Sequence, residues 1–226
     1  MESTCVKLVR DSHPSPIAGL SITAAAMLML GAVLVSALVV RPALAAADPM
    51  AVVQRTVNDA LGVLRNKQLP DDQRREQLKQ IIARSFDFTE MSRSALGYHW
   101  RQISPDQQQE FTRVFTTFIE DSYLAKINDY SGQQVQFIRQ RNDGPQYSQV
   151  QTNIVAPGKD PIAVNYRLLS KDGHWKVYDV TVDAISIIAN YRNQFNRVMN
   201  NQGYAKLIAD LESKQQALAA SLGDRR

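Results

Sequence analysis

The sequence predicts an α+β domain in which a curved, four-stranded antiparallel sheet packs against helices from both ends of the chain. Three observations support this prediction. Apolar residues recur at helical spacing over residues 49–123, alternate with polar residues over 135–182, and return to helical spacing after Asp183. Because helices and strands follow one another in blocks instead of alternating, the pattern favours an α+β fold over a parallel α/β fold.

Four helices are predicted ahead of the sheet. The first begins at Asp48-Pro49, where an N-cap residue precedes a proline at the first helical position, and it ends before Leu69-Pro70. The second spans residues 71–85, and the third follows it and stops at Gly97. Ser104-Pro105 opens the fourth, whose apolar stripe consists of Phe111, Val114, Phe115, Phe118, Ile119 and Tyr123.

Four runs of residues alternate as strands do, and short segments rich in Gly, Pro, Asn and Asp separate them. The runs are residues 135–141, 147–156, 161–170 and 175–182. Short turns of this kind join antiparallel neighbours. The third run alternates most clearly, and one of its faces consists of Ile162, Val164, Tyr166 and Leu168.

An apolar stripe at helical spacing predicts a long helix after the sheet. The stripe consists of Ile185, Ile188, Tyr191, Phe195 and Val198. Gly203 separates this helix from a last one that carries Leu207, Ile208 and Leu211. A curved sheet with helices across one face encloses an apolar pocket wherever the helices stand away from the strands, and we expect such a pocket between the two.

The N-terminal 47 residues have the pattern of a secretory signal peptide. Lys7 and Arg10 precede an uncharged stretch over residues 17–40, and the small-residue run of residues 43–47 follows it. We expect cleavage after Ala45 or Ala47, which leaves residues 48–226 as a single domain. The alternative is an uncleaved anchor, since the uncharged stretch is long enough to cross a bilayer.

The composition of the chain excludes several classes of function. Residues 48–226 hold 23 Lys and Arg against 20 Asp and Glu, a balance that does not predict nucleic-acid binding. The one cysteine, Cys5, precedes the uncharged stretch, so we expect no disulfide in the exported chain. With His99 and His174 as the remaining histidines, no zinc spacing exists and no nucleotide-binding loop is found. We therefore expect no catalytic residues, metal or cofactor.

The arginines of the chain fall on different predicted elements. They include Arg93, Arg101, Arg113, Arg139, Arg141, Arg167, Arg192 and Arg197. Singly, each is expected on a solvated face or in an ion pair. A subset near the mouth of a pocket would attract phosphate groups or an anionic membrane surface.

Two separated segments resemble the MlaC family, also called the toluene-tolerance family, which includes hopanoid-associated members. Residues 86–97, FDFTEMSRSALG, followed by Trp100-Arg101, resemble its N-terminal signature, which QQQEFTRVFTTF over 107–118 continues. Residues 172–180, DGHWKVYDV, resemble its last hairpin, and 185–195 resemble its following helix. The resemblance covers nearly all of residues 48–213.

The resemblance implies a periplasmic lipid carrier with an NTF2-like fold. Such a carrier holds phospholipid, or a hopanoid-related lipid, and shuttles it between an outer-membrane lipoprotein complex and an inner-membrane ABC transporter with an MCE-domain subunit. The lipid is cargo and no cofactor is implied. Two alternatives stay open: an NTF2-like pocket enzyme that uses Asp179 or Asp183 as a base, and a non-catalytic docking subunit of the transporter.

We expect apolar side chains of the sheet and of the flanking helices to form the wall of the lipid pocket. They are Phe115, Phe118, Val150, Ile154, Val164, Tyr166, Leu168, Val177, Ile188, Tyr191 and Phe195. Two acyl chains hold about 30 methylenes, whose transfer from water is worth on the order of 25 kcal/mol. Release into water is therefore excluded, and unloading requires docking on a membrane protein.

Overall fold

The computed structural model describes residues 48–127 and 132–223. The predicted signal peptide and its two cleavage positions lie outside these residues. Among the described helices, none is long and apolar enough to cross a membrane.

The first two helices, α1 (Pro49–Arg65) and α2 (Asp71–Ser85), begin as predicted. The Asp48 carboxylate accepts a hydrogen bond from the Ala51 amide at 3.3 Å, and Pro49 occupies the first helical position. Asn66 ends α1 earlier than predicted, so the turn into α2 is longer.

The segment after α2 contains α3 (Phe88–Leu96), a 3₁₀ helix η1 (Gly97–Arg101) and α4 (Pro105–Ile127). Asp87 caps α3 by accepting from the Glu90 amide at 2.8 Å. Ser104 and Gln107 form a reciprocal capping box at the start of α4, with hydrogen bonds of 3.2 and 3.0 Å. Local sequence signals therefore set the beginnings of both helices.

The sheet is antiparallel, with the strands in chain order. They are β1 (Gln134–Asn142), β2 (Tyr147–Val155), β3 (Ile162–Lys171), β4 (His174–Val182) and β5 (Ile185–Ser186). Four strands were predicted, and β5 is the strand that the prediction did not include. Asp183 and Ala184, at φ of 46° and 67°, fold β5 back onto β4. Neither is glycine, so the turn has no clear signature in the sequence.

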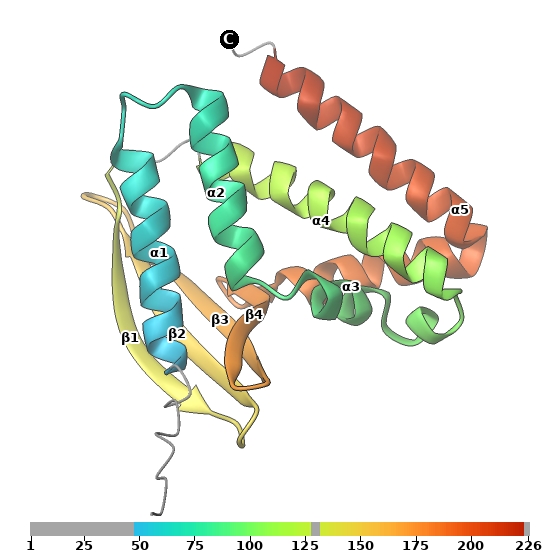
Figure 1. Ribbon diagram of the computed structural model, residues 1–226, viewed down its shortest axis with the longest axis horizontal. Coiled ribbons are helices and arrows are strands. Elements are labelled where there is room, and N and C mark those ends of the chain that lie inside the picture. The colour runs from blue at the N-terminus through green and yellow to red at the C-terminus, as the bar shows by residue number, and fades with distance from the viewer. Residues whose placement is uncertain (1–47, 128–131, 224–226) are drawn as a thin grey trace, which may run out of the picture. The chain divides into compact units, whose positions relative to one another are not determined.

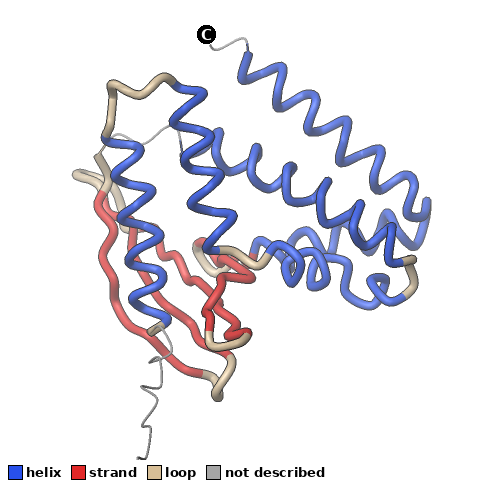
Figure 2. Tube along the Cα trace, in the orientation of Figure 1, coloured by secondary structure: helices blue, strands red, loops and turns tan. Residues whose placement is uncertain are grey.

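The last helix, α5 (Ile187–Gly223), bends at Gly203, whose φ is 79° and ψ is −178°. The predicted separation into two helices at this residue is confirmed. Figure 1 shows α5 running beside α4 after the bend, and α1 lying across one face of the sheet with α2 beside it. The strands gather on one side and most of the helices on the other (Figure 2).

Buried apolar side chains form three clusters. The helical cluster lies among α3, α4 and α5 and is built on Phe111, Phe115, Ile188, Phe195 and Leu207. The sheet cluster joins α1 to the strands through Val53, Val150, Leu168 and Val177. The third, which we call the upper cluster, joins α1, α2 and α4 through Leu64, Leu78 and Leu124.

Candidate functional site

The inner face of the sheet, which is the face covered by α1, carries the apolar side chains of the central strands. Strand register sets the neighbours on this face, which include the cross-strand pairs Val150–Tyr166, Thr152–Val164, Ile154–Ile162 and Leu168–Val177. Residues directly opposite each other in antiparallel strands point to the same side. All six strand residues predicted for the pocket therefore share one face.

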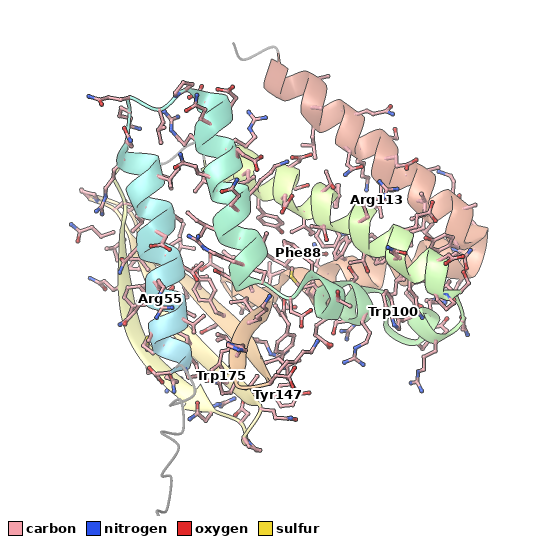
Figure 3. The ribbon with its side chains drawn as sticks, in the orientation of Figure 1. Arg55, Phe88, Trp100, Arg113, Tyr147 and Trp175 are labelled. Atoms are coloured by element: carbon pink, nitrogen blue, oxygen red, sulfur yellow. The ribbon has the colours of Figure 1, made fainter. Side chains whose placement is uncertain are left out.

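The end of this face nearest the β1–β2 and β3–β4 turns is fully packed. Val53 of α1 contacts Val150, Leu168 and Val177, and none of the four is more than 1% exposed. The Met50 amide donates to Gln140 Oε1 at 2.7 Å and ties the start of α1 to β1. Tyr147 and Trp175 mark this end of the sheet in Figure 3. These side chains form a closed floor.

The other half of the inner face is less completely covered. Ile154 is half-buried, its partner Ile162 is 42% exposed, and Val164 is 5% exposed. As far as the described residues define them, none of the three clusters includes Ile154 or Val164. Val164 is therefore buried, and Ile154 with Ile162 at the end of the face is the part of the predicted wall that is left partly exposed.

Tyr166 gives the inner face a polar group. Burial raises the pKa of Tyr166 to about 12, although a hydrogen bond with Thr152 acts in the opposite direction. The hydroxyl of Thr152 donates to the Val164 carbonyl at 3.2 Å, so its own polar group is satisfied. Tyr166 therefore adds no charge to this face at neutral pH.

The five helical residues predicted for the pocket lie together in the helical cluster. Phe115 packs edge-to-face on Phe195 at 5.4 Å, and Phe118 packs in the same way on Tyr191 at 5.5 Å. Ile188 is 2% exposed in the same cluster. The structure thus places these five in one packed group and the six strand residues on the sheet face. Phe86 packs against both the helical and the sheet clusters and lies between them.

Tyr191 and Tyr123 lie at the edge of the helical cluster. Burial raises the pKa of Tyr123 to about 12, with Tyr191 and Asp179 adding to the effect. Burial also raises the pKa of Tyr191, which hydrogen-bonds Tyr123. Both phenols are protonated at neutral pH, so this edge also presents no tyrosinate charge.

The two aspartates considered as catalytic bases have structural partners. Asp179 is 3% exposed and accepts from the Ser186 hydroxyl at 2.7 Å and from the Ile188 amide at 3.2 Å. Arg167 Nη1 lies 3.8 Å from Asp179 Oδ2, the oxygen that also accepts from Ser186. Asp183 lies in the exposed turn before β5 and accepts from the Ala163 amide at 3.2 Å. Asp179 therefore anchors the start of α5, and Asp183 fixes the β4–β5 turn.

The surface cavities with walls of described residues include four whose volumes range from about 260 to 630 Å³. None of the eleven predicted pocket residues lines any of these four. The largest is bordered by three arginines, Arg93, Arg101 and Arg192, on α3, η1 and α5. The eleven-residue wall therefore stays a prediction, and the arginine cavity is a separate feature.

Sequence reasoning missed several inner-face residues. Val180 and Val182 pair with Tyr166 and Val164 across β3 and β4. Their alternation was visible in the sequence, but the register shift near Leu168 places Val177 and Val180 on one face three residues apart. The contribution of α1 through Val53 was also missed, although its apolar stripe pointed to a buried face.

Comparison with known proteins identifies relatives over most of the chain. The family model of the MlaC protein matches residues 54–213. The chain is 25% identical over 188 residues to the intermembrane phospholipid transport system binding protein MlaC of Haemophilus influenzae, across 80% of this chain and 88% of that one. It is 27% identical over 164 residues to the toluene tolerance protein ttg2D of Pseudomonas putida, across 70% of this chain and 76% of that one.

A solved structure shares this fold. It is the phospholipid-binding protein from Ralstonia solanacearum, determined in complex with a phospholipid. The two structures align with a TM-score of 0.70 and 28% sequence identity, across 76% of this chain and 99% of that one.

Proposed function

Because the chain belongs to the MlaC family, we propose that it binds a phospholipid in the periplasm and carries it between the two membranes. The observation that carries this proposal is the phospholipid bound to the Ralstonia solanacearum protein. Nearly the whole length of that protein aligns with this chain. The name of the Haemophilus influenzae relative assigns that protein to phospholipid transport as well.

The half of the inner sheet face around Ile154 and Val164 is the proposed seat of the acyl chains. Its side chains are apolar, they are not packed into the described clusters, and Tyr166 beside them carries no charge at neutral pH. The closed floor of Val53, Val150 and Leu168 limits how deep the chains reach. The phosphate-bearing headgroup then remains at the solvent end, because burial of an unpaired charge is costly.

Docking on membrane proteins is part of the proposed function. Transfer of two acyl chains to water costs on the order of 25 kcal/mol, so a loaded carrier does not release its cargo into water. The proposed partners are an inner-membrane ABC transporter with an MCE-domain subunit and an outer-membrane lipoprotein complex. Export by the N-terminal signal peptide brings the chain into the compartment between them. Hopanoid-related lipid is the alternative cargo, and no cofactor is needed.

Native mass spectrometry of the chain from Asp48 onward, purified gently from a periplasmic extract, tests the proposal. We expect a mass excess that solvent extraction identifies as phospholipid. A hopanoid in the extract would change the cargo class and keep the carrier role. A clean apo mass would contradict the carrier role and favour a docking subunit without cargo.

A further inference from the structure

The largest of the four cavities lies among helices and away from the inner face of the sheet. Its volume is about 630 Å³. The lining residues come from α3, η1 and α5 and are Arg93, Ser94, Gly97, Trp100, Arg101 and Arg192. Figure 3 labels Trp100, which is half-buried in η1. The cavity brings Arg192 together with residues 93–101, which lie about ninety positions earlier in the sequence, so the tertiary fold forms its wall.

Positive charge dominates the wall of this cavity. Arg93 is neutralised by Glu90, which accepts from its Nε at 3.0 Å and from its Nη2 at 2.6 Å. Arg101 and Arg192 are both exposed, and within the described residues neither forms an ion pair. Two uncompensated guanidinium groups therefore border one cavity.

The Arg192 side chain is held in place before any ligand arrives. Its Nε donates to the Ser94 carbonyl at 2.6 Å, which leaves the two terminal NH₂ groups for another acceptor. Its aliphatic part packs on Gly97, where an added Cβ would lie 3.6 Å from Arg192 Cδ. Gly97 has a φ of 58°, which favours glycine. A fixed guanidinium loses little conformational entropy on binding, and this favours affinity.

We propose that this cavity is a phosphate-binding site that takes a phosphate ester. Guanidinium groups match phosphate geometry because they donate parallel hydrogen bonds to two oxygens at once. A water molecule occupies roughly 30 Å³ in the liquid, so the cavity has room for the alcohol part of an ester as well as for the anion. The ester comes from a free phosphate compound or from a lipid headgroup at a membrane surface. The site is independent of the acyl-chain site on the sheet.

Nuclear magnetic resonance of the full domain from Asp48 onward tests for the site directly. Glycerol 3-phosphate is titrated at constant ionic strength, with sodium chloride as the reference, while the Trp100 indole N–H and the Nε–H signals of Arg101 and Arg192 are followed. We expect saturable shifts of these signals with glycerol 3-phosphate and none with chloride. Shifts that do not saturate, or that chloride reproduces, would overturn the proposal.

Variants assign the binding to the two free guanidinium groups. Arg101→Gln is expected to weaken glycerol 3-phosphate binding by at least about tenfold, because it removes the charge-assisted hydrogen bonds of one guanidinium group. Arg192→Lys keeps the positive charge but cannot donate two parallel hydrogen bonds to one phosphate. It is therefore expected to weaken binding while a cation remains at the α3–α5 contact. Arg197→Gln is the matched control, because this exposed residue of α5 does not line the cavity. If all three variants bound glycerol 3-phosphate with the affinity of the wild type, the assignment to Arg101 and Arg192 would be overturned.

Vesicle sedimentation separates the two sources of the ester. Vesicles of phosphatidylcholine alone are compared with equimolar phosphatidylcholine and phosphatidylglycerol. Binding only to the anionic vesicles, lost in Arg101→Gln and kept in Arg197→Gln, would identify the headgroup at a membrane surface as the ligand. Binding of glycerol 3-phosphate with no difference between the vesicles would identify a free ester. A domain that binds neither anionic vesicles nor glycerol 3-phosphate would refute the site.

Discussion

Replacement of Ile154 by tryptophan is the sharpest test of the acyl-chain site on the sheet. Ile154 is half-buried on the inner face of β2 and lies outside the three described clusters. Tryptophan is favourable in strands, so the strand accepts it. We expect Ile154→Trp to keep the fold and to lose the bound phospholipid, because the indole occupies the space of the chains.

The size of the effect follows from the volume that the new side chain takes. Tryptophan carries about six more heavy atoms than isoleucine and so displaces roughly six methylenes, at about 0.8 kcal/mol each. The loss is about 5 kcal/mol, which corresponds to more than three orders of magnitude in affinity. Val150→Trp has a different outcome. Val150 is 0% exposed in the closed floor, so the larger side chain overpacks the cluster and destabilises the domain.

Native mass spectrometry after gentle purification measures the fraction of protein that carries lipid, and circular dichroism monitors folding. Asn153→Trp is the matched control, since Asn153 is the neighbour of Ile154 in β2 and faces the other side of the sheet. The control is expected to keep its lipid. Wild-type lipid occupancy in a folded Ile154→Trp protein would refute the placement of the chains on this half of the face.

Three further predictions concern stability. Leu168→Ala truncates a side chain that is 0% exposed, and we expect thermal unfolding to show a loss of about 3 kcal/mol and about 10 °C in melting temperature, while Ile138→Ala, at 52% exposed, changes little. Ala184→Gly removes the Cβ from a residue at φ 67°, so urea unfolding is expected to show a gain of about 1 kcal/mol, and a loss would contradict the strain argument. Burial alone would raise the pKa of Asp87, but hydrogen bonds from Lys171 and from the Glu90 amide outweigh it and hold the pKa below 3.8. A lowered folded-state pKa stabilises the fold above the unfolded value, and this contribution disappears as the pH falls through the folded value. Asp87→Asn should therefore show a weaker loss of stability with acid than the wild type, as measured by urea unfolding across that range.

Helix starts and strand positions could be predicted because their signals are local. Asp48-Pro49 and Ser104-Pro105 mark the starts of α1 and α4, and the alternation of residues in β3 places Val164, Tyr166 and Leu168 on one face. The bend of α5 follows from Gly203, which alone in that stretch lacks a side chain. In each case one residue or a few neighbours determine the backbone, so no knowledge of distant contacts is needed.

The missed features depend on contacts between distant residues. The turn before β5 uses Asp183 and Ala184 at positive φ, which the hydrogen bonds to Ala163 stabilise from across the sheet. The separation of the pocket residues into a sheet face and a helical cluster depends on how α4 and α5 pack. An apolar stripe such as that of Phe115 and Phe118 shows that a helix face is buried, but it does not show which partner covers it.

The division into clusters bears on how a carrier alternates between loaded and empty states. The aromatic group around Phe115 and Phe195 and the closed floor around Val150 are tightly packed. On the proposed function the acyl chains bind outside both groups, so neither has to rearrange for cargo to enter or leave. On the proposed function, the half of the sheet face around Ile154 and Ile162 is the part whose burial changes when acyl chains enter. The upper cluster, which joins α1, α2 and α4, is separate from the sheet cluster. On the proposed function this division keeps the domain folded when a lipid leaves. A shuttle requires this because a bound lipid worth on the order of 25 kcal/mol in transfer energy must pass to a partner at every cycle.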